Sequence, residues 1–590
     1  MDTIEAVTAL SIGDERFLVN SLIERCPKSM MVRELFMNAC EAAAAAGGQV
    51  RLDSVLVEGI RKLRFWNTGP GLSPRDLHRM CDIASSIRKM NGLDQNFGMG
   101  AKVAALPSNR HGMRYRSCHE GRVTEVVLCQ RDGIYGRLQR AGADGESQDL
   151  FDVTAEYAEG ALLQADWTEV VLLGNEAGQD TVSDPYQGSP ASSPGWLEQK
   201  LRERFHTLHP KVQVTIAGDL TESGRPSLFR PDWAGMPGFR TEAVETRSGI
   251  VIHYGFLPPS LQADPSVFPG PGAGAVVHRG EIYAAVTDAD WLLLAPELGI
   301  SFAAQHCSVV IEIPADYPVR ADGYREVLRY HGGSQRLIAL KDFGAIVSAR
   351  MPVWLARLIQ TFAPPEVDYQ RGLAEELMDL ISDLGVPRTT RPNLLPRHER
   401  PDRVVNLTRE SERPRRERDP SAVRPPPSPP KPEASPADPA EAPRRSLADA
   451  PEIIIVTDEA EIEGRSLRDR AARFYLSNNK LYVNGLYRAL QSGAERLAGE
   501  FAEKAEPKTV ERLARRAAEW AMVRRVARGV VHGLTKKTQG WGEAEVERAM
   551  SPEALSLLAD DLVDSLPEMR LRIEALIAAE APAALTGRAA

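Results

Sequence analysis

The sequence predicts a mixed α/β protein of several domains that ends in a mainly helical region. Segments with the apolar spacing of helices alternate with β-rich runs from residue 14 to residue 384. Residues 387–450 are dominated by proline and charge, with too few apolar residues to form a core. The chain of 590 residues is also too long for one hydrophobic core, so we expect several.

These features divide the chain into four predicted parts. We expect α/β domains at 1–222 and 223–386, a disordered Pro/Arg-rich linker at 387–450 and a mainly helical C-terminal domain at 451–590. The linker includes the run Pro-Pro-Pro-Ser-Pro-Pro at 425–430, which favours extended polyproline structure.

The composition is typical of a soluble globular protein, with 43% hydrophobic residues, 26% charged residues and a net charge of -9. No apolar run approaches the roughly 20 residues that span a bilayer. The N-terminus lacks the basic start and apolar stretch of a signal peptide. The cysteines form no C-x-x-C pair, which favours reduced thiols. We therefore expect a cytoplasmic protein with no membrane partner and no zinc site.

The start of the first domain combines a long helix with a strand pair. We expect a helix over 14–46, strands over 49–57 and 60–66, and a glycine-rich turn over 67–72. A second helix is expected to begin at Ser73, which can cap it, with Pro74 in the first turn. The later elements expected in this domain are a polar segment at 84–97, a helix from about 100 to 106, an antiparallel sheet over 111–174, a loop at 175–194, a helix at 195–208 and a strand at 211–217.

Beyond the first domain, the pattern predicts a second strand-rich unit and then helices. The expected strands are 249–254, 274–277 and 308–313, and the expected helices are about 336–363 and 366–384. After the linker we expect one short strand at 453–456, followed by helical structure throughout 464–580.

Three polar residues on the first helix are the first candidates for chemistry. Glu34, Asn38 and Glu41 are spaced by four and three residues, which places them on one helix face. An acid and an amide on such a face suggest a bound cation or a held water. The alternative is an ordinary amphipathic surface helix.

Two glycine motifs follow this helix at short range. A strand leads into Asn67-x-Gly69-x-Gly71, and a polar segment leads into Gly98-x-Gly100-x-Lys102 at a helix start. Together with Glu34 and Asn38, and with a later strand that begins at Thr168, this order resembles the GHKL ATPase superfamily. That superfamily includes gyrase, heat-shock-90 chaperones, histidine kinases, MutL and MORC proteins. The resemblance covers about residues 14–220 and implies a Bergerat-type α/β sandwich in the first domain.

The resemblance implies that ATP and Mg²⁺ are the cofactors. Glu34 matches the general base, which orients and deprotonates the attacking water. Asn38 matches the magnesium ligand, a neutral oxygen suited to a hard cation. Glu41 occupies a position that is usually aspartate, and its longer side chain can reach the metal through water. Lys102 matches a cation near the terminal phosphates and is assigned to the catalytic set as well as to the nucleotide site.

The remaining implied contacts surround the nucleotide. Glycines in the first turn let the backbone pass close to the base and ribose, and the second motif offers amide hydrogens to phosphate oxygens. Thr168 matches the threonine that helps to hold adenine. The implied ATP-binding residues, besides Asn38, Glu41, Lys102 and Thr168, are Asn67, Gly69, Gly71, Leu72, Gly98, Met99, Gly100 and Ala101.

Asn67 departs from the superfamily pattern, which has aspartate at this position to accept a hydrogen bond from the adenine amine. The Asn67 carbonyl oxygen can accept the same bond, but the amide can also turn and donate. Base selectivity is therefore open at this point, and the alternative interpretation is that Asn67 only caps the turn.

Residues 73–97 correspond to the lid of related ATPases. Ser85, Ser86 and Lys89 resemble a Ser-x-x-Lys element found there in MORC-like proteins. A lid that orders over the triphosphate would couple nucleotide state to shape. An ordinary polar loop is the alternative.

The Gly-x-Gly-x-Lys element is more similar to MORC proteins than to MutL, whose Phe-Arg-Gly-Glu-Ala-Leu motif is absent. A histidine kinase is not expected, because that class has a dimerising phosphoacceptor helix before the ATPase and here the resemblance starts near residue 14. In the superfamily, the second domain acts as a transducer and supplies a basic residue to the terminal phosphate. Arg320, Arg325 and Lys341 are the candidates, and the sequence does not choose among them.

The leading functional hypothesis is an ATP hydrolase that closes its lid and forms a nucleotide-dependent homodimer while acting on DNA or a DNA-bound complex. The alternatives are a chaperone-like or protein-interaction scaffold that recruits partners through the Pro-rich linker, and a nucleotide-binding regulator without turnover. DNA binding would use the arginine-rich linker and a basic C-terminal segment, although a solvated helix face also explains that segment. Its basic residues, with Trp520 and Trp541 nearby, are Arg512, Arg515, Arg516, Arg524, Arg525, Arg528, Lys536 and Lys537.

Overall fold

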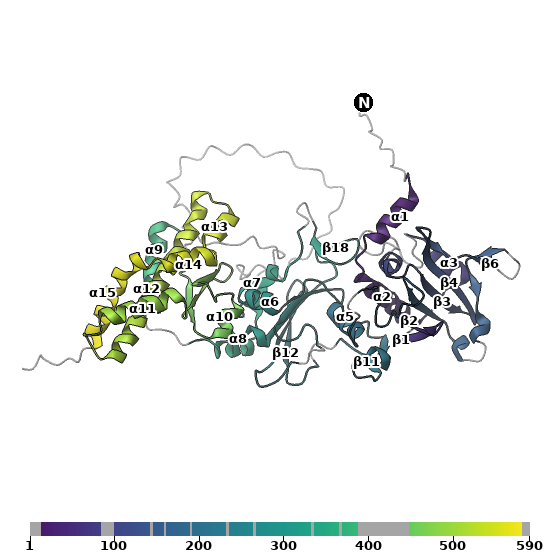
Figure 1. Ribbon diagram of the computed structural model, residues 1–590, viewed down its shortest axis with the longest axis horizontal. Coiled ribbons are helices and arrows are strands. Elements are labelled where there is room, and N and C mark those ends of the chain that lie inside the picture. The colour runs from purple at the N-terminus through teal and green to yellow at the C-terminus, as the bar shows by residue number, and fades with distance from the viewer. Residues whose placement is uncertain are drawn as a thin grey trace, which may run out of the picture. The chain divides into compact units, whose positions relative to one another are not determined.

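The computed structural model shows a mixed α/β protein, which confirms the predicted class (Figure 1). It divides into two compact units, which are described separately. The first contains residues up to Thr287 together with His306–Leu340, and the second contains Asp288–Gln305 and the chain from Lys341 onward. The structure describes residues 13–45, 47–83, 100–141, 146–157, 161–188, 192–231, 235–263, 267–331, 336–364, 369–386 and 448–580.

The first unit contains a 9-stranded sheet with the order β11-β10-β1-β2-β9-β3-β4-β5, and β8 pairs with β4. Only β1 and β10 pair in parallel among the pairs of this sheet that the structure describes. The bounds are β1 Gln49–Val57, β2 Ile60–Thr68, β3 Gly112–His119, β4 Arg122–Arg131, β5 Ile134–Arg137, β8 Phe151–Asp152, β9 Trp167–Gly174, β10 Gln213–Ile216 and β11 Ser227–Phe229.

The expected single helix over 14–46 is wrong, because the structure has two helices there. Helix α1 spans Glu15–Glu24 and α2 spans Met30–Ala44. Pro27 lies between them; it has no N–H to donate and its ring disfavours a continuous helix. The break lets α2 bury Leu35 and Phe36 in a core that includes Phe65 of β2.

The strands expected around the first glycine motif are confirmed, as is the helix that follows. Helix α3 spans Pro74–Met80, and the Ser73 side chain accepts a hydrogen bond from the backbone N–H of Asp76. Residues 84–99 lie outside the described residues, and with them Gly98, Met99, Ser85, Ser86 and Lys89. Helix α4 spans Gly100–Ala105 and continues as a 3₁₀ turn through Ser108.

The first sheet continues past the predicted domain boundary at 222, because β11 ends at Phe229. A second sheet follows in the same compact unit, with the order β12-β13-β17-β14-β15 and β16 paired to β14. The bounds are α5 Trp196–Arg204, β12 Arg240–Glu245, β13 Val251–Phe256, β14 Ala273–His278, β15 Glu281–Ile282, β16 Val286–Thr287 and β17 Cys307–Ile313, followed by the hairpin of β18 Val319–Ala321 and β19 Leu328–Tyr330.

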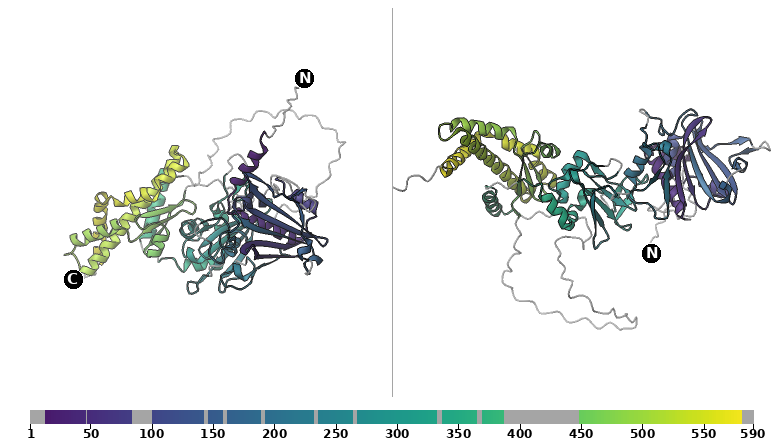
Figure 2. Two further views of the ribbon diagram at one scale, coloured as in Figure 1. Left: turned by 45° about the vertical axis from the view of Figure 1, so that its right-hand side comes forward. Right: turned by 90° about the horizontal axis from the view of Figure 1, so that it is seen from below.

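The second unit is mainly helical but includes a 3-stranded sheet with the order β20-β22-β21. Its helices after residue 450 lie together in Figures 1 and 2 (green to yellow), whereas the earlier ones are teal. The bounds are α6 Asp288–Leu294, α7 Gly344–Arg350, α8 Val353–Gln360, α9 Gln370–Leu384, β20 Glu452–Val456, α10 Glu459–Gly464, β21 Ala472–Tyr475, β22 Lys480–Asn484, α11 Arg488–Glu500, α12 Pro507–Thr535, α13 Glu543–Ala549, α14 Pro552–Asp560 and α15 Leu562–Glu580.

Two expectations for this unit are wrong. Helical structure throughout 464–580 is interrupted by β21 and β22, and β22 contains the buried strand formers Tyr482 and Val483. The expected helix over 336–363 is divided by Pro352 into α7 and α8. The expected strand at 453–456 is confirmed as β20. The predicted linker falls almost entirely on residues 387–447, outside the described part. None of the described helices is long and apolar enough to cross a membrane.

Candidate functional site

The polar face of α2 is present as the spacing predicts. Asn38 and Glu41 are exposed, and the side chain of Glu34 is 12% exposed. The opposite face is buried, including Leu35 and Phe36. The helix therefore holds two carboxylates and one amide oxygen along one side, with Glu34 the most enclosed of the three.

The first glycine turn is in contact with both α2 and β3. Gly69 has a φ of +155°, and a Cβ built there would lie 2.8 Å from the carbonyl oxygen of Ala42. Gly71 has a φ of +55°, and its Cβ would lie 2.2 Å from the carbonyl oxygen of Cys118. Only glycine satisfies both the backbone angle and the close approach. The turn thus runs between the end of α2 and the end of β3.

We expect Gly71→Ala to destabilise the protein by about 3 kcal/mol, because it adds a steric clash to the cost of a left-handed backbone. Gly59→Ala is the matched control, since Gly59 has a φ of +79° with nothing within 4 Å. The control should cost about 1 kcal/mol. Denaturant unfolding of both variants measures the difference, and equal midpoints would contradict the packing of this turn.

Three neighbouring strands place polar side chains beside this turn. Asn67 of β2 is paired in register with Thr168 of β9, and Thr168 is paired with Ser117 of β3. All three are on the face that carries the core residues Phe65, Tyr115 and Val170, because positions two apart share a face. The structure therefore brings Asn67 and Thr168 together. Sequence reasoning missed Ser117, although its place in the alternation Met113, Tyr115, Ser117 marks a polar group on a buried strand face.

The start of α4 lies against Glu34. A Cβ built at Gly100 would lie 1.8 Å from Glu34 Oε2, so the backbone is in contact with the carboxylate. Ala101 is buried in the core beside it. The structure thus brings Glu34 of α2 and Gly100 of α4 into contact.

Lys102 has partners that the sequence did not indicate. Its side chain is buried, and Nζ donates hydrogen bonds of 2.6 Å to the carbonyl oxygens of both Met80 and Asp82, at and just after the end of α3. Burial lowers the pKa of Lys102 to about 8. The ammonium group thus caps α3 in this structure.

The burial of Lys102 predicts a pH-dependent stability. The unfolded chain holds this proton up to a pH of about 10.5, whereas the folded chain releases it near pH 8. Between these values the unfolded state binds more protons, so the free energy of unfolding rises with pH. Relative to Lys102→Met, the wild type should gain about 3 kcal/mol across this window. Denaturant unfolding of both proteins at several pH values tests this, and a constant difference between them would contradict it.

A small cavity of about 40 Å³ opens beside Glu34. It is lined by residues of α1 and α2, by α4, and by the turn between β18 and β19 that includes Arg325. Of the three basic candidates in the second domain, Arg325 is the one that lines this cavity. Arg320 lies in β18, and Lys341 belongs to the other compact unit.

A buried charge cluster adjoins the cavity. The Arg33 guanidinium is only 3% exposed, contacts Glu34 and forms two hydrogen bonds with Glu281 of β15, of which Nε to Oε2 is 2.8 Å. Arg204 of α5 donates to the same Glu281 oxygen at 2.9 Å and to the carbonyl oxygen of Arg325 at 2.7 Å. The cluster therefore links Glu34 to both the second sheet and the Arg325 turn.

The arginines keep the buried acid ionised. Burial acts to raise the pKa of Glu281, but the hydrogen bonds and charges of Arg33 and Arg204 outweigh it and lower that pKa. Burial likewise acts to lower the pKa of Arg33, and the bond to Glu281 with the charges of Glu34 and Glu281 raises it overall. No local sequence signal connects Arg33 with Glu281, which is 248 residues away.

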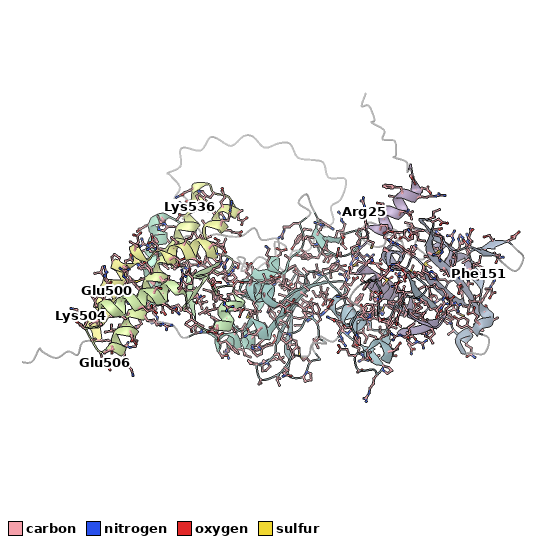
Figure 3. The ribbon with its side chains drawn as sticks, in the orientation of Figure 1. Arg25, Phe151, Glu500, Lys504, Glu506 and Lys536 are labelled. Atoms are coloured by element: carbon pink, nitrogen blue, oxygen red, sulfur yellow. The ribbon has the colours of Figure 1, made fainter. Side chains whose placement is uncertain are left out.

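Several basic residues of the C-terminal segment are engaged within the protein. Arg512 pairs with Glu580 at 2.6 Å, Arg525 pairs with Asp561 at 2.8 Å, and Arg524 pairs with Glu376 and Glu568 at 2.7 and 2.9 Å. A similar pair joins Arg570 to Glu500, which is labelled in Figure 3. Arg512, Arg524 and Arg525 of α12 and Arg570 of α15 are therefore partly neutralised.

No family model matches the sequence, and no curated protein matches it. The geometry of the site and the motifs that it brings together are accordingly the basis for assigning a function.

Proposed function

We propose that the protein binds ATP with Mg²⁺ on α2 and the first sheet, in a Bergerat-type fold of the GHKL class, and hydrolyses it. One observation carries this proposal. Glu34, the start of α4 and the Arg325 turn line a single cavity, and its volume of about 40 Å³ is enough for a water molecule. A carboxylate and an arginine that line one cavity large enough for a water molecule suit hydrolysis of the terminal phosphoanhydride bond of ATP, in which the carboxylate would orient the attacking water.

The surrounding residues fit the two ends of the nucleotide. Asn67 and Thr168 would bind the base, with the Gly69–Leu72 turn beside it. Asn38 is one helical turn from Glu34 and offers a neutral oxygen to the metal, while Glu41 reaches it through water. These oxygen donors suit Mg²⁺, which would neutralise charge on the phosphates.

Arg325, in the turn between β18 and β19, is the proposed contact to the terminal phosphate. Its backbone is held by Arg204, which is in turn fixed by Glu281. Phosphate binding by Arg325 would therefore be transmitted to the cluster that contacts Glu34. Lys102 would serve the phosphates only after leaving the carbonyl oxygens at the end of α3.

The direct test is phosphate release from ATP by the full chain, with Mg²⁺ and with excess chelator. We expect turnover that depends on Mg²⁺, together with binding of a non-hydrolysable ATP analogue. Binding without release would favour the nucleotide-binding regulator instead. Absence of both would reject the proposal.

For the biological role, we propose lid closure and nucleotide-dependent dimerisation on DNA or a DNA-bound complex. Sizing the protein with and without the ATP analogue tests the dimer. Titration with duplex DNA at several salt concentrations tests the DNA partner, and no binding at low salt would exclude it. The ion pairs on α12 favour a second candidate, an ATP-switched scaffold for protein partners, which predicts partners that survive nuclease treatment in a pulldown.

A further inference from the structure

Ser117 connects the two parts of the proposed base site. Its side chain is fully buried, and its hydroxyl accepts a hydrogen bond of 2.8 Å from the backbone N–H of Leu72 in the glycine turn. The same oxygen lies 3.0 Å from the carbonyl oxygen of Trp167 and 2.9 Å from Thr168 Oγ1. One serine therefore holds both the turn and the threonine.

The hydroxyl protons in this group can be assigned by counting donors and acceptors. The carbonyl oxygen of Trp167 only accepts, so Ser117 must give it the single hydroxyl proton; otherwise two oxygens would face each other at 3.0 Å without a proton. The contact between Ser117 and Thr168 then needs a proton from Thr168. Thr168 consequently has only lone pairs left for a ligand.

The Asn67 side-chain amide is oriented so that it, like Thr168, offers a hydrogen-bond acceptor. Its Nδ2 donates a hydrogen bond of 3.0 Å to the carbonyl oxygen of Thr68, which orients the amide. Within the described residues, Oδ1 has no hydrogen-bond donor, so it remains an acceptor for a ligand. Asn67 and Thr168, in register on neighbouring strands, thus present two acceptors on one sheet face.

We propose that Ser117 is a positioning residue that makes this site select a 6-amino purine over a 6-oxo purine. This inference rests on the proposed nucleotide site. Two acceptors complement an amino group, which has two N–H donors, and they repel a carbonyl oxygen. Without Ser117, the Thr168 hydroxyl is free to turn and donate, and the Leu72 N–H loses its partner.

The test is equilibrium binding of ATP and ITP, whose bases differ by a 6-amino and a 6-oxo group, in the full chain with Mg²⁺. Wild type should prefer ATP. In Ser117→Ala, the ATP affinity should fall about threefold to tenfold, the range expected for lost neutral hydrogen bonds, and the ATP-to-ITP ratio should fall by a similar factor. In turnover, the KM for ATP should rise with kcat unchanged, because the change lies at the base.

Ser308→Ala is the matched control, since Ser308 is also a fully buried strand serine and its hydroxyl has no partner in the described residues. It should leave the ATP-to-ITP ratio at the wild-type value. A wild-type ratio in Ser117→Ala, or equal binding of ATP and ITP by the wild type, would overturn the role of Ser117 while leaving the nucleotide site in place. No binding of either nucleotide by the wild type would reject the proposed function, and this inference with it.

Discussion

Glu34→Gln is expected to lower ATP turnover by about 100- to 10,000-fold, the usual contribution of a general base. Glutamine keeps the shape of the side chain, so the cavity beside α4 and the contact with Arg33 should be preserved. It cannot accept the proton of the attacking water. The loss should therefore appear in kcat, with binding of the ATP analogue unchanged.

Glu24→Gln is the control for this experiment. Glu24 is an exposed carboxylate at the end of α1, and it pairs with Arg110 at 2.8 Å outside the cavity. Its replacement should leave turnover within about twofold of the wild type. Equal turnover in Glu34→Gln and wild type would remove Glu34 from the role of base.

Glu281→Gln is expected to destabilise the protein by about 3–5 kcal/mol, because it leaves the buried charges of Arg33 and Arg204 without their shared counterion. Denaturant unfolding measures this cost. Glu198→Gln on α5 is the control, since Glu198 pairs with Arg202 near the surface and should cost under about 1 kcal/mol.

A triple replacement separates charge from packing in the same cluster. With Arg33→Met, Arg204→Met and Glu281→Leu together, the three most buried charges are removed as a group and only Glu34, whose side chain is 12% exposed, loses a partner, so stability should recover toward the wild-type value. Turnover should nevertheless be lower than in the wild type, because Arg33 no longer contacts Glu34. If Glu281→Gln cost no more than Glu198→Gln, the cluster would not be holding the site together.

The features that were predictable from sequence are those with local causes. The pairing of β1 with β2, the Ser73 cap and the polar face of α2 each depend on residues a few positions apart. The two helix breaks were also local, since Pro27 and Pro352 mark them, but apolar spacing on both sides outweighed that signal. Strands β21 and β22 were missed because short apolar runs between helices do not distinguish the two structures.

The parts of the site that sequence reasoning did not find depend on tertiary contacts. Glu281 meets Arg33 only because the second sheet packs beside α2. The carbonyl oxygens that hold Lys102 belong to the backbone, which has no residue-specific signal. Nothing local in the sequence distinguishes Ser117 from other serines, and its role depends on the pairing of β3 with β9. Asn67, which sequence left open between donor and acceptor, is oriented by a bond to its neighbour's carbonyl.

The contact between Gly100 and Glu34 also constrains how this protein can vary. Any side chain at position 100 would occupy the space of the Glu34 carboxylate, whose Oε2 lies 1.8 Å from the ideal Cβ position. A residue with a Cβ there would push the Glu34 carboxylate, the end of a flexible side chain, out of its present position beside the cavity, and Glu34→Asp would relieve the clash by withdrawing the carboxylate. Positions 34 and 100 are therefore coupled, and substitutions at the two should be non-additive when combined.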